Sequence, residues 1–172
     1  MKGKGVRMAK TIVIINGTGG SGKDTFVEFT GKYAPVLNFS SVDKVKEIAR
    51  LIGWDGGKTE KDRKFLADLK KLTSEYNDMP FKSVAQKVEE FKNSDKQIMF
   101  IHIREPENIQ RAVDEFGAYT LLVKREGKSN IMSNYSDANV DNYNYDFIIE
   151  NDTLENLEKR AKAFIEELRT SK

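Results

Sequence analysis

The sequence predicts a three-layer α/β fold in which a five-stranded parallel sheet lies between helices on both faces. Short apolar stretches typical of buried strands alternate with segments whose apolar residues recur at helical spacing. In addition, the first apolar stretch runs into a glycine-rich turn and then into a polar helix start. Such a junction at the carboxyl edge of a parallel sheet is suited to holding phosphate groups.

The expected strands are runs rich in β-branched and aromatic residues that end at turn residues. Pro35 separates the second strand from the helix before it, because proline cannot continue a helix. The strands are expected at residues 10–16, 36–40, 98–103, 119–123 and 146–149.

The expected helices follow from apolar residues spaced three and four apart. Thr59 with Asp62 three residues later resembles an N-terminal capping signal, and Gly53 ends the helix before it. The helix after Thr59 carries the apolar residues Phe65, Leu66, Leu69, Leu72 and Tyr76. The other helices are expected at about 22–33, 42–52, 81–91, 109–116 and 154–168.

The turn after the first strand matches the phosphate-binding loop, or P-loop, in both composition and spacing. Its pattern is Gly17-x4-Gly22-Lys23, between a strand and a helix. Glycines allow successive backbone N–H groups to converge on phosphate oxygens, and the lysine reaches the β- and γ-phosphates. The residues expected to bind the nucleotide are Gly17, Gly19, Gly20, Ser21, Gly22, Lys23, Asp24 and Thr25.

Two carboxylates are candidates to hold Mg²⁺. Asp24 stands where the loop normally has the hydroxyl residue that contacts the metal, and Asp43 follows the second strand. A carboxylate at that strand end can face the γ-phosphate. Asp43 can also serve simply to stabilise the start of a helix, because the first turn favours aspartate.

Positive groups expected at the same edge of the sheet are Arg104 and Arg125, which end the third and fourth strands. A planar guanidinium suits bidentate phosphate contact, so Arg104 is a candidate for the acceptor phosphate and Arg125 for the transferring one. An ion pair with Glu105 or Glu107 is the alternative for Arg104. His102, the only histidine, occupies a position where P-loop enzymes commonly carry a metal-orienting aspartate, although a lone strand histidine is more often a core residue.

Composition narrows the class of protein. The chain of 172 residues is expected to form a single domain at residues 10–172, after a leader at 1–9 that is a disordered start or a vector remnant. Without the leader, 26 basic and 27 acidic residues remain, which does not favour a nucleic-acid or membrane surface. There is no cysteine for disulfides or thiolate metal sites. We expect a cytoplasmic protein, either a monomer or a homodimer.

Two segments are expected to complete the site. The two helices at about 53–92 form an insertion at the carboxyl edge of the sheet, where a second substrate would lie. The irregular segment at about 125–144 lacks periodicity, and a loop of that length in a small domain is usually a functional lid or disordered.

With these residues in view, the chain resembles the P-loop nucleotide kinases, most closely the phage-type deoxynucleoside monophosphate kinases. The segments that carry the resemblance are 21–25, with Asp in place of the usual hydroxyl residue, and 43–46, 52–58, 103–108 and 146–154. One departure is His102, because the family usually has an acidic residue two positions before the strand-end arginine.

This resemblance implies Mg²⁺-dependent transfer of the γ-phosphate of ATP to a nucleoside or deoxynucleoside monophosphate. Lys23 and the loop amides would stabilise the transferring group, Thr25 would contact the α-phosphate, and Arg104 would hold the acceptor. Asp24 and Asp43 would hold the metal or its waters. The alternatives are a small-metabolite kinase, acting on dephospho-coenzyme A, phosphomevalonate or a sugar acid, and a non-catalytic nucleotide-binding module.

Overall fold

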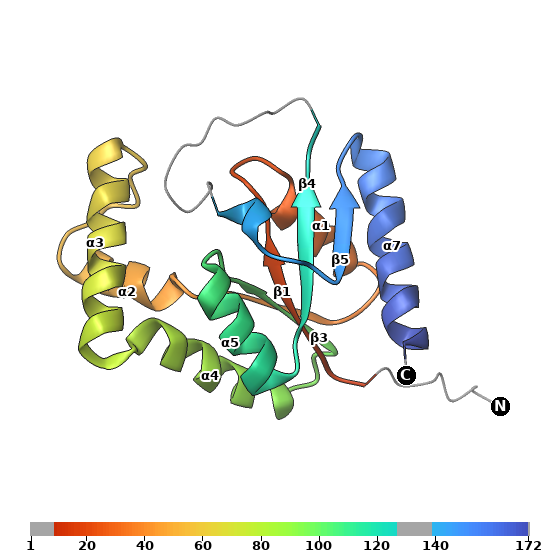
Figure 1. The fold of residues 1–172 in the computed structure, drawn as a ribbon, viewed down its shortest axis with the longest axis horizontal. Coiled ribbons are helices and arrows are strands. Elements are labelled where there is room, and N and C mark those ends of the chain that lie inside the picture. The colour runs from red at the N-terminus through yellow and green to blue at the C-terminus, as the bar shows by residue number, and fades with distance from the viewer. Residues whose placement is uncertain (1–8, 127–138, 172) are drawn as a thin grey trace.

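A computed structural model of the chain describes residues 9–126 and 139–171. Its centre is a five-stranded sheet in the order β2-β3-β1-β4-β5, in which all neighbouring strands are parallel (Figure 1). The strands are β1 (Thr11–Asn16), β2 (Val36–Ser40), β3 (Ile98–His102), β4 (Tyr119–Lys124) and β5 (Phe147–Glu150). The predicted fold class is therefore confirmed.

Helices cover both faces of this sheet (Figure 1). Apart from the short 3-10 helix η1 (Val140–Asn142), they are α1 (Lys23–Thr30), α2 (Asp43–Leu51), α3 (Glu60–Asn77), α4 (Met79–Lys92), α5 (Pro106–Phe116) and α7 (Leu154–Thr170). No helix in these two described ranges has the length and hydropathy needed to cross a bilayer.

Successive residues of β1 supply the two hydrophobic cores, because side chains alternate between the faces of a strand. Val13 and Ile15 pack in the core beneath α1 and α7, whereas Ile12 and Ile14 pack in the core beneath α4 and α5. Burial on both faces explains why the central strands are almost continuously apolar in the sequence.

The strand order determines where a ligand can bind at the carboxyl edge of the sheet. β1 lies between β3 and β4. The chain leaves β1 toward β2 on one side of the sheet, and it reaches β4, on the other side of β1, only after β3. In open α/β sheets ligands bind at such a switch point. The glycine-rich turn follows β1 directly at this place.

The helix α3 lies apart from both cores. Its apolar stripe belongs to neither core, and none of its residues is buried. It packs on α2 and α4, and Figure 1 shows it at the far left, away from the sheet. The other expected elements have bounds within a few residues of the observed ones. Of the predicted lid at 125–144, residues 127–138 lie outside the described part of the chain, as do residues 1–8 of the leader.

Replacing Phe100 with alanine should destabilise the fold by about 3–5 kcal/mol, because it would leave a cavity in the core beneath α1 and α7. The ring is fully buried on β3, with centroids 6.3 Å from Phe26 and 6.4 Å from Phe164. Urea denaturation measures the loss. Leu154→Ala, at a side chain that is 65% exposed, is the control and should change stability by less than about 0.5 kcal/mol.

Candidate functional site

The loop between β1 and α1 adopts the conformation that the glycine spacing predicts. Gly20 and Gly22 have φ angles of 75° and 94°, in the left-handed region that strongly favours glycine. Gly22 is the N-cap of α1, and no side-chain hydrogen bond caps this helix start. The positive end of the α1 dipole therefore faces the loop without a side-chain oxygen across it.

Close packing also requires glycine in this loop. A Cβ on Gly17 would lie 2.4 Å from Ser21 Oγ and 2.7 Å from the Val123 carbonyl oxygen. A Cβ on Gly22 would lie 2.3 Å from Asn151 Nδ2. Two of the four loop glycines are therefore fixed by contacts with the loop itself and with the ends of β4 and β5.

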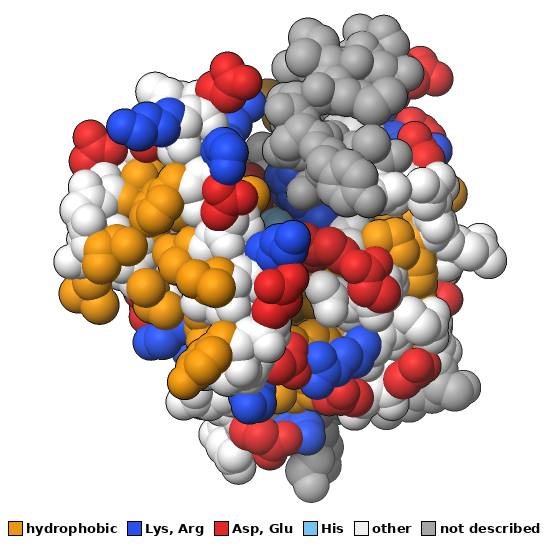
Figure 2. Space-filling model, turned by 60° about the vertical axis from the view of Figure 1, so that its left-hand side comes forward, with side chains coloured by type: hydrophobic (Ala, Val, Ile, Leu, Met, Phe, Trp, Pro, Cys, Tyr) orange, Lys and Arg blue, Asp and Glu red, His pale blue; other side chains and the backbone are white. Residues whose placement is uncertain are grey.

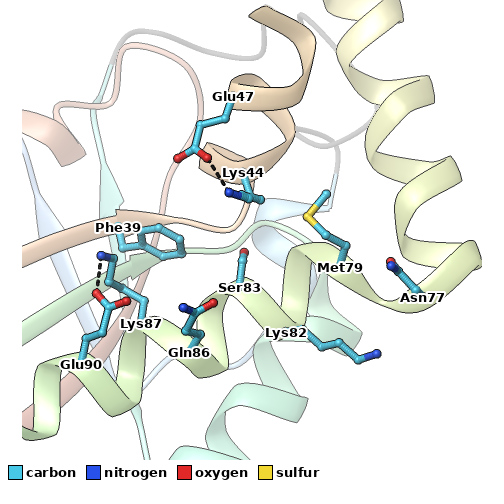
Figure 3. Close-up of a pocket in the computed structure, with 10 residues that line it drawn as sticks. All are labelled: Phe39, Lys44, Glu47, Asn77, Met79, Lys82, Ser83, Gln86, Lys87 and Glu90. Atoms are coloured by element: carbon cyan, nitrogen blue, oxygen red, sulfur yellow. Dashed lines mark hydrogen bonds and ion pairs between the residues drawn. The ribbon is translucent and has the colours of Figure 1, made fainter. Parts of the chain in front are cut away.

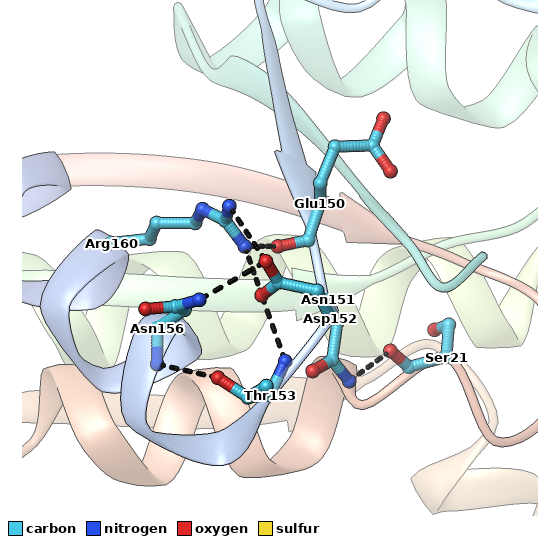
Figure 4. Close-up of polar contacts among 7 residues, drawn as sticks. All are labelled: Ser21, Glu150, Asn151, Asp152, Thr153, Asn156 and Arg160. Carbon is cyan, nitrogen blue, oxygen red and sulfur yellow. Dashed lines mark hydrogen bonds and ion pairs between the residues drawn. The ribbon is translucent and has the colours of Figure 1, made fainter.

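Asparagines at the ends of β1 and β5 hold the loop in place. Asn16 Oδ1 accepts a hydrogen bond from the Gly17 amide at 2.8 Å, and Asn16 Nδ2 donates to the Tyr145 hydroxyl oxygen at 2.9 Å. Asn151 Nδ2 donates to the Ser21 carbonyl at 2.9 Å (Figure 4). The Tyr145 hydroxyl donates to the Val140 carbonyl, and burial raises the pKa of this tyrosine to about 12, so it stays protonated.

The turn between β5 and α7 is fixed by a compact group of polar contacts (Figure 4). Thr153 caps α7, since its hydroxyl oxygen accepts from the Asn156 amide at 3.2 Å. Arg160 binds Asp152 Oδ1 at 2.7 Å and also contacts the Glu150 carbonyl. Hydrogen bonds from the Arg160 guanidinium hold the pKa of Asp152 well below its usual range.

A cavity of about 290 Å³ joins this turn to the glycine-rich loop. Its lining residues come from the loop, the start of α1, the end of β4 and the turn after β5: Gly20, Gly22, Lys23, Asp24, Thr25, Arg125, Asn151, Asp152 and Leu154. The structure thus brings Arg125 together with most of the predicted loop residues. The sequence did not single out Asn151 or Asp152 as site residues, although adjacent polar residues directly after a strand are a usable signal.

The remaining candidates gather around His102, at the end of β3. The charges that act on this imidazole belong to Asp24, Lys23, Asp43 and Arg104. His102 Nδ1 lies 3.9 Å from Asp24 Oδ1, and the Asp24 side chain is 82% exposed, so it is accessible to a ligand. The register of β2 and β3 aligns Ser40 with His102, which brings the start of α2 to the same edge.

His102 is uncharged at neutral pH. Burial is the main cause that lowers its pKa from 6.5 to about 4, and the neighbouring aspartates oppose this effect only in part. His102 Nε2 lies 2.7 Å from Asn38 Oδ1 on the adjacent strand. Because an amide oxygen only accepts, this contact places the imidazole proton on Nε2 and leaves the Nδ1 lone pair on the side of Asp24.

Asp43 has a structural contact in addition to its predicted metal role. Its Oδ2 accepts a hydrogen bond from the Ser40 amide at 2.9 Å, which closes the turn between β2 and α2. The described residues contain no group of three or more His, Asp or Glu side chains that could enclose a metal ion. A magnesium ion that takes one or two carboxylates plus substrate phosphates does not need such a group.

An ion pair links the insertion to the end of β3. Lys70 on α3 binds Glu105, which directly follows Arg104, and both side chains are largely buried. Burial alone would raise the pKa of Glu105, but the Lys70 charge and hydrogen bond outweigh it and hold that pKa below its usual value. Arg104 itself is tied to β1 through its carbonyl oxygen, 3.4 Å from Asn16 Nδ2.

A second cavity, of about 300 Å³, lies between α2 and α4 beside the edge strand β2 (Figure 3). Four of its charged side chains pair locally, as Lys44 with Glu47 at 2.8 Å and Lys87 with Glu90 at 2.6 Å. None of the predicted site residues lines it. We therefore assign the functional site to the smaller cavity, which contains the loop.

Comparison with known proteins agrees with this fold. No protein-family model and no curated protein matches the sequence. Among solved structures, the shikimate kinase of Aquifex aeolicus aligns with a TM-score of 0.52 at 10% identity, over 94% of this chain and 100% of its own. A sugar kinase from a Janibacter species has a TM-score of 0.51 at 13% identity, over 92% and 95% of the two chains. The APS kinase of Mycobacterium tuberculosis has a TM-score of 0.50 at 12% identity, over 95% and 99%.

At these identities the similarity establishes the fold and not the substrate. The chain has the fold of P-loop small-molecule kinases, with a five-stranded parallel sheet and a glycine-rich loop after its central strand.

Acid should destabilise the folded protein through His102. The unfolded chain binds a proton on this residue below about pH 6.5, whereas the folded chain binds it only near pH 4. The free energy of unfolding should therefore fall as the pH drops from about 6.5 to about 4, by up to roughly 3 kcal/mol. Denaturant unfolding across this range measures the effect.

His102→Gln removes the titrating ring and serves as the reference for all other acidic transitions. The wild-type curve should be steeper than that of the variant between these two pH values and parallel to it at higher pH. Two parallel curves throughout the range would contradict the buried, neutral imidazole.

Proposed function

We propose that the protein transfers the γ-phosphoryl group of ATP to a small acceptor, and that the acceptor is a nucleoside or deoxynucleoside monophosphate. The observation that carries this proposal is the glycine cradle of residues 17–22 in front of α1, with Lys23 and Arg125 on the same cavity. The similarity in fold to shikimate, sugar and APS kinases supports a small-molecule acceptor.

The loop fits a polyphosphate by its own packing. Ser21 Oγ is buried and has no hydrogen-bond partner among the described residues, which is uncommon for a hydroxyl group in a protein interior. The uncapped start of α1 provides N–H groups and a positive dipole end beside it. A triphosphate supplies the acceptor oxygens that the N–H groups at the start of α1 need.

Catalysis by these residues consists of positioning and charge neutralisation. Lys23 and the loop amides would stabilise the negative charge on the transferring group, and Arg125 would approach it from β4. Arg104, held at the end of β3, would bind the phosphate of the acceptor in a bidentate manner. Asp24 and Asp43 would hold Mg²⁺, which supplies further neutralisation of the phosphate charges when it is bound with ATP.

His102 is poorly suited to deprotonating a hydroxyl acceptor. A hydroxyl acceptor has to lose its proton during transfer, whereas the oxygen of a monophosphate is already ionised at neutral pH. An imidazole with a pKa of about 4 is a weak base, so it contributes little to removing a proton. The hydroxyl-bearing small metabolites are the second candidate class of acceptor, because the similar solved structures include shikimate and sugar kinases.

Lys23→Ala should lower phosphoryl transfer by at least about a hundredfold while leaving the fold intact, because it removes the charge nearest the transferring group. A coupled assay of ADP release across natural nucleoside monophosphates, shikimate and sugar acids identifies the acceptor and measures this loss. Lys162→Ala, at an exposed position on α7, is the matched control and should retain wild-type turnover. Turnover by Lys23→Ala equal to that of the control would rule out the loop as the catalytic site.

Arg104→Ala should raise the KM for the acceptor at least about tenfold and change the KM for ATP far less, because only the acceptor loses a charged contact. Steady-state kinetics with each substrate varied in turn separates the two effects. Arg63→Ala on α3, an exposed arginine, controls for the loss of positive charge near the insertion. An equal increase for both substrates would contradict the acceptor role.

A further inference from the structure

The side chains of Asp24 and His102 face each other at the carboxyl edge of the sheet. His102 Nδ1 lies 3.9 Å from Asp24 Oδ1. Asp24 is in the first turn of α1, and His102 ends β3, where the register with β1 aligns it with Ile15. The pairing of these two strands therefore brings an oxygen donor from the phosphate loop and a nitrogen donor from β3 to one place.

The Asn38 side chain fixes the proton of the imidazole. Asn38 Oδ1, on the neighbouring strand β2, lies 2.7 Å from His102 Nε2, so Nε2 donates and Nδ1 carries a lone pair. A histidine that binds a metal ion almost always donates its other ring N–H to an oxygen or a water, which fixes both the tautomer and the direction of the ring. His102 therefore has the arrangement of a metal ligand before any cation is bound.

The distance between the two groups also fits a shared cation. A carboxylate oxygen and an imidazole lone pair are both acceptors, so they attract each other only through a donor or a cation between them. Two ligands that are each about 2.1 Å from one cation lie between about 3 and 4.2 Å apart. The observed separation of 3.9 Å is within this span, and the Asp24 side chain is 82% exposed, so a cation can reach it from solvent.

We propose that His102 Nδ1 and Asp24 are direct ligands of the cation that accompanies the nucleotide, and that this cation is a first-row transition-metal dication such as Mn²⁺. The inference rests on the proposed function, because the phosphates of ATP supply the other ligands. Imidazole nitrogen suits transition metals, whereas Mg²⁺ takes oxygen ligands. Mg²⁺ can still bind through Asp24 and the phosphates, but only a transition metal gains the contact with His102.

The charge around the site does not by itself select a dication. Figure 2 shows acidic side chains next to basic ones across one face of the molecule, and the formal net charge of the chain is +2. Lys23 and Arg104 also act on the His102 ring. These two cations oppose a bare dication, so we expect tight binding only together with a polyphosphate. Direct ligands, and not a general negative field, then decide which metal is bound.

Pulsed electron paramagnetic resonance of Mn²⁺ tests the direct contact. His102 is the only histidine of the sequence, so a chain that is labelled with ¹⁵N-histidine and has no histidine tag carries the label at one residue. The sample contains Mn²⁺ and the β,γ-methylene analogue of ATP, which cannot transfer its γ-phosphate. The expected result is a hyperfine coupling between Mn²⁺ and ¹⁵N of the size found for a directly bonded imidazole. Mn²⁺ is the weakest binder of its series, which makes the test stringent.

His102→Asp replaces the nitrogen ligand by an oxygen ligand and should move the preference of the site toward Mg²⁺. Titration calorimetry with the same analogue measures the Kd of the protein for its Mn²⁺ complex and for its Mg²⁺ complex. The ratio of the Mg²⁺ value to the Mn²⁺ value should fall by at least about tenfold in the variant, because only Mn²⁺ loses a nitrogen contact.

Two variants of Asn38, an exposed residue, test the orientation of the ring. Asn38→Leu removes the acceptor of the His102 proton and should raise the Kd for the Mn²⁺ complex about tenfold, with a much smaller change for Mg²⁺. The matched control Asn38→Asp keeps an oxygen acceptor at the same position and should bind Mn²⁺ at least as tightly as wild type. Thermal unfolding of each variant checks that the fold is retained.

Binding of the Mn²⁺ complex without a ¹⁵N coupling would overturn the assignment of His102 and leave the proposed function standing. An unchanged metal preference in His102→Asp, or equal effects of the two Asn38 variants, would also overturn it. A chain that binds the analogue with neither metal would overturn the proposed function, and the inference with it.

Discussion

The close approach of backbone and side chains around the glycine-rich loop is the constraint on which the rest of this structure depends. Gly17 lies against the Val123 carbonyl, and Gly22 lies against Asn151, with no space for a Cβ in either place. The loop is therefore fixed by β4 and β5 as well as by β1. Its amides are preorganised, which matters because phosphoryl transfer is accelerated by dipoles that do not have to reorganise.

The charge state of His102, at the end of the adjacent strand β3, also depends on close packing. His102 is surrounded by two aspartates and two cations, and yet its burial outweighs the aspartates and keeps the ring neutral. The ring therefore adds no positive charge between Lys23 and Arg104. The histidine is therefore a neutral hydrogen-bonding group at this edge of the sheet.

The insertion has two sides with different properties. Its inner side reaches the strand edge through the Lys70–Glu105 pair, next to the arginine that we assign to the acceptor. Elsewhere on α3, Leu72 and Tyr76 are exposed to solvent. The helix α3 packs mainly on α2 and α4, so the geometry of the sheet constrains it less than it constrains the helices that cover the two cores.

Local patterns in the sequence were sufficient for the strands, for the glycine loop and for the position of Arg125, because strand periodicity and φ requirements act between neighbouring residues. The tertiary structure alone decided the contact of Asn151 with Ser21, 130 positions apart, the charge state of His102, and the exposure of Leu72 and Tyr76 on α3. These features depend on which elements meet and on how deeply a group is buried. A helical period indicates which face of a helix packs on the rest of the molecule, but it does not say how much of that face stays exposed.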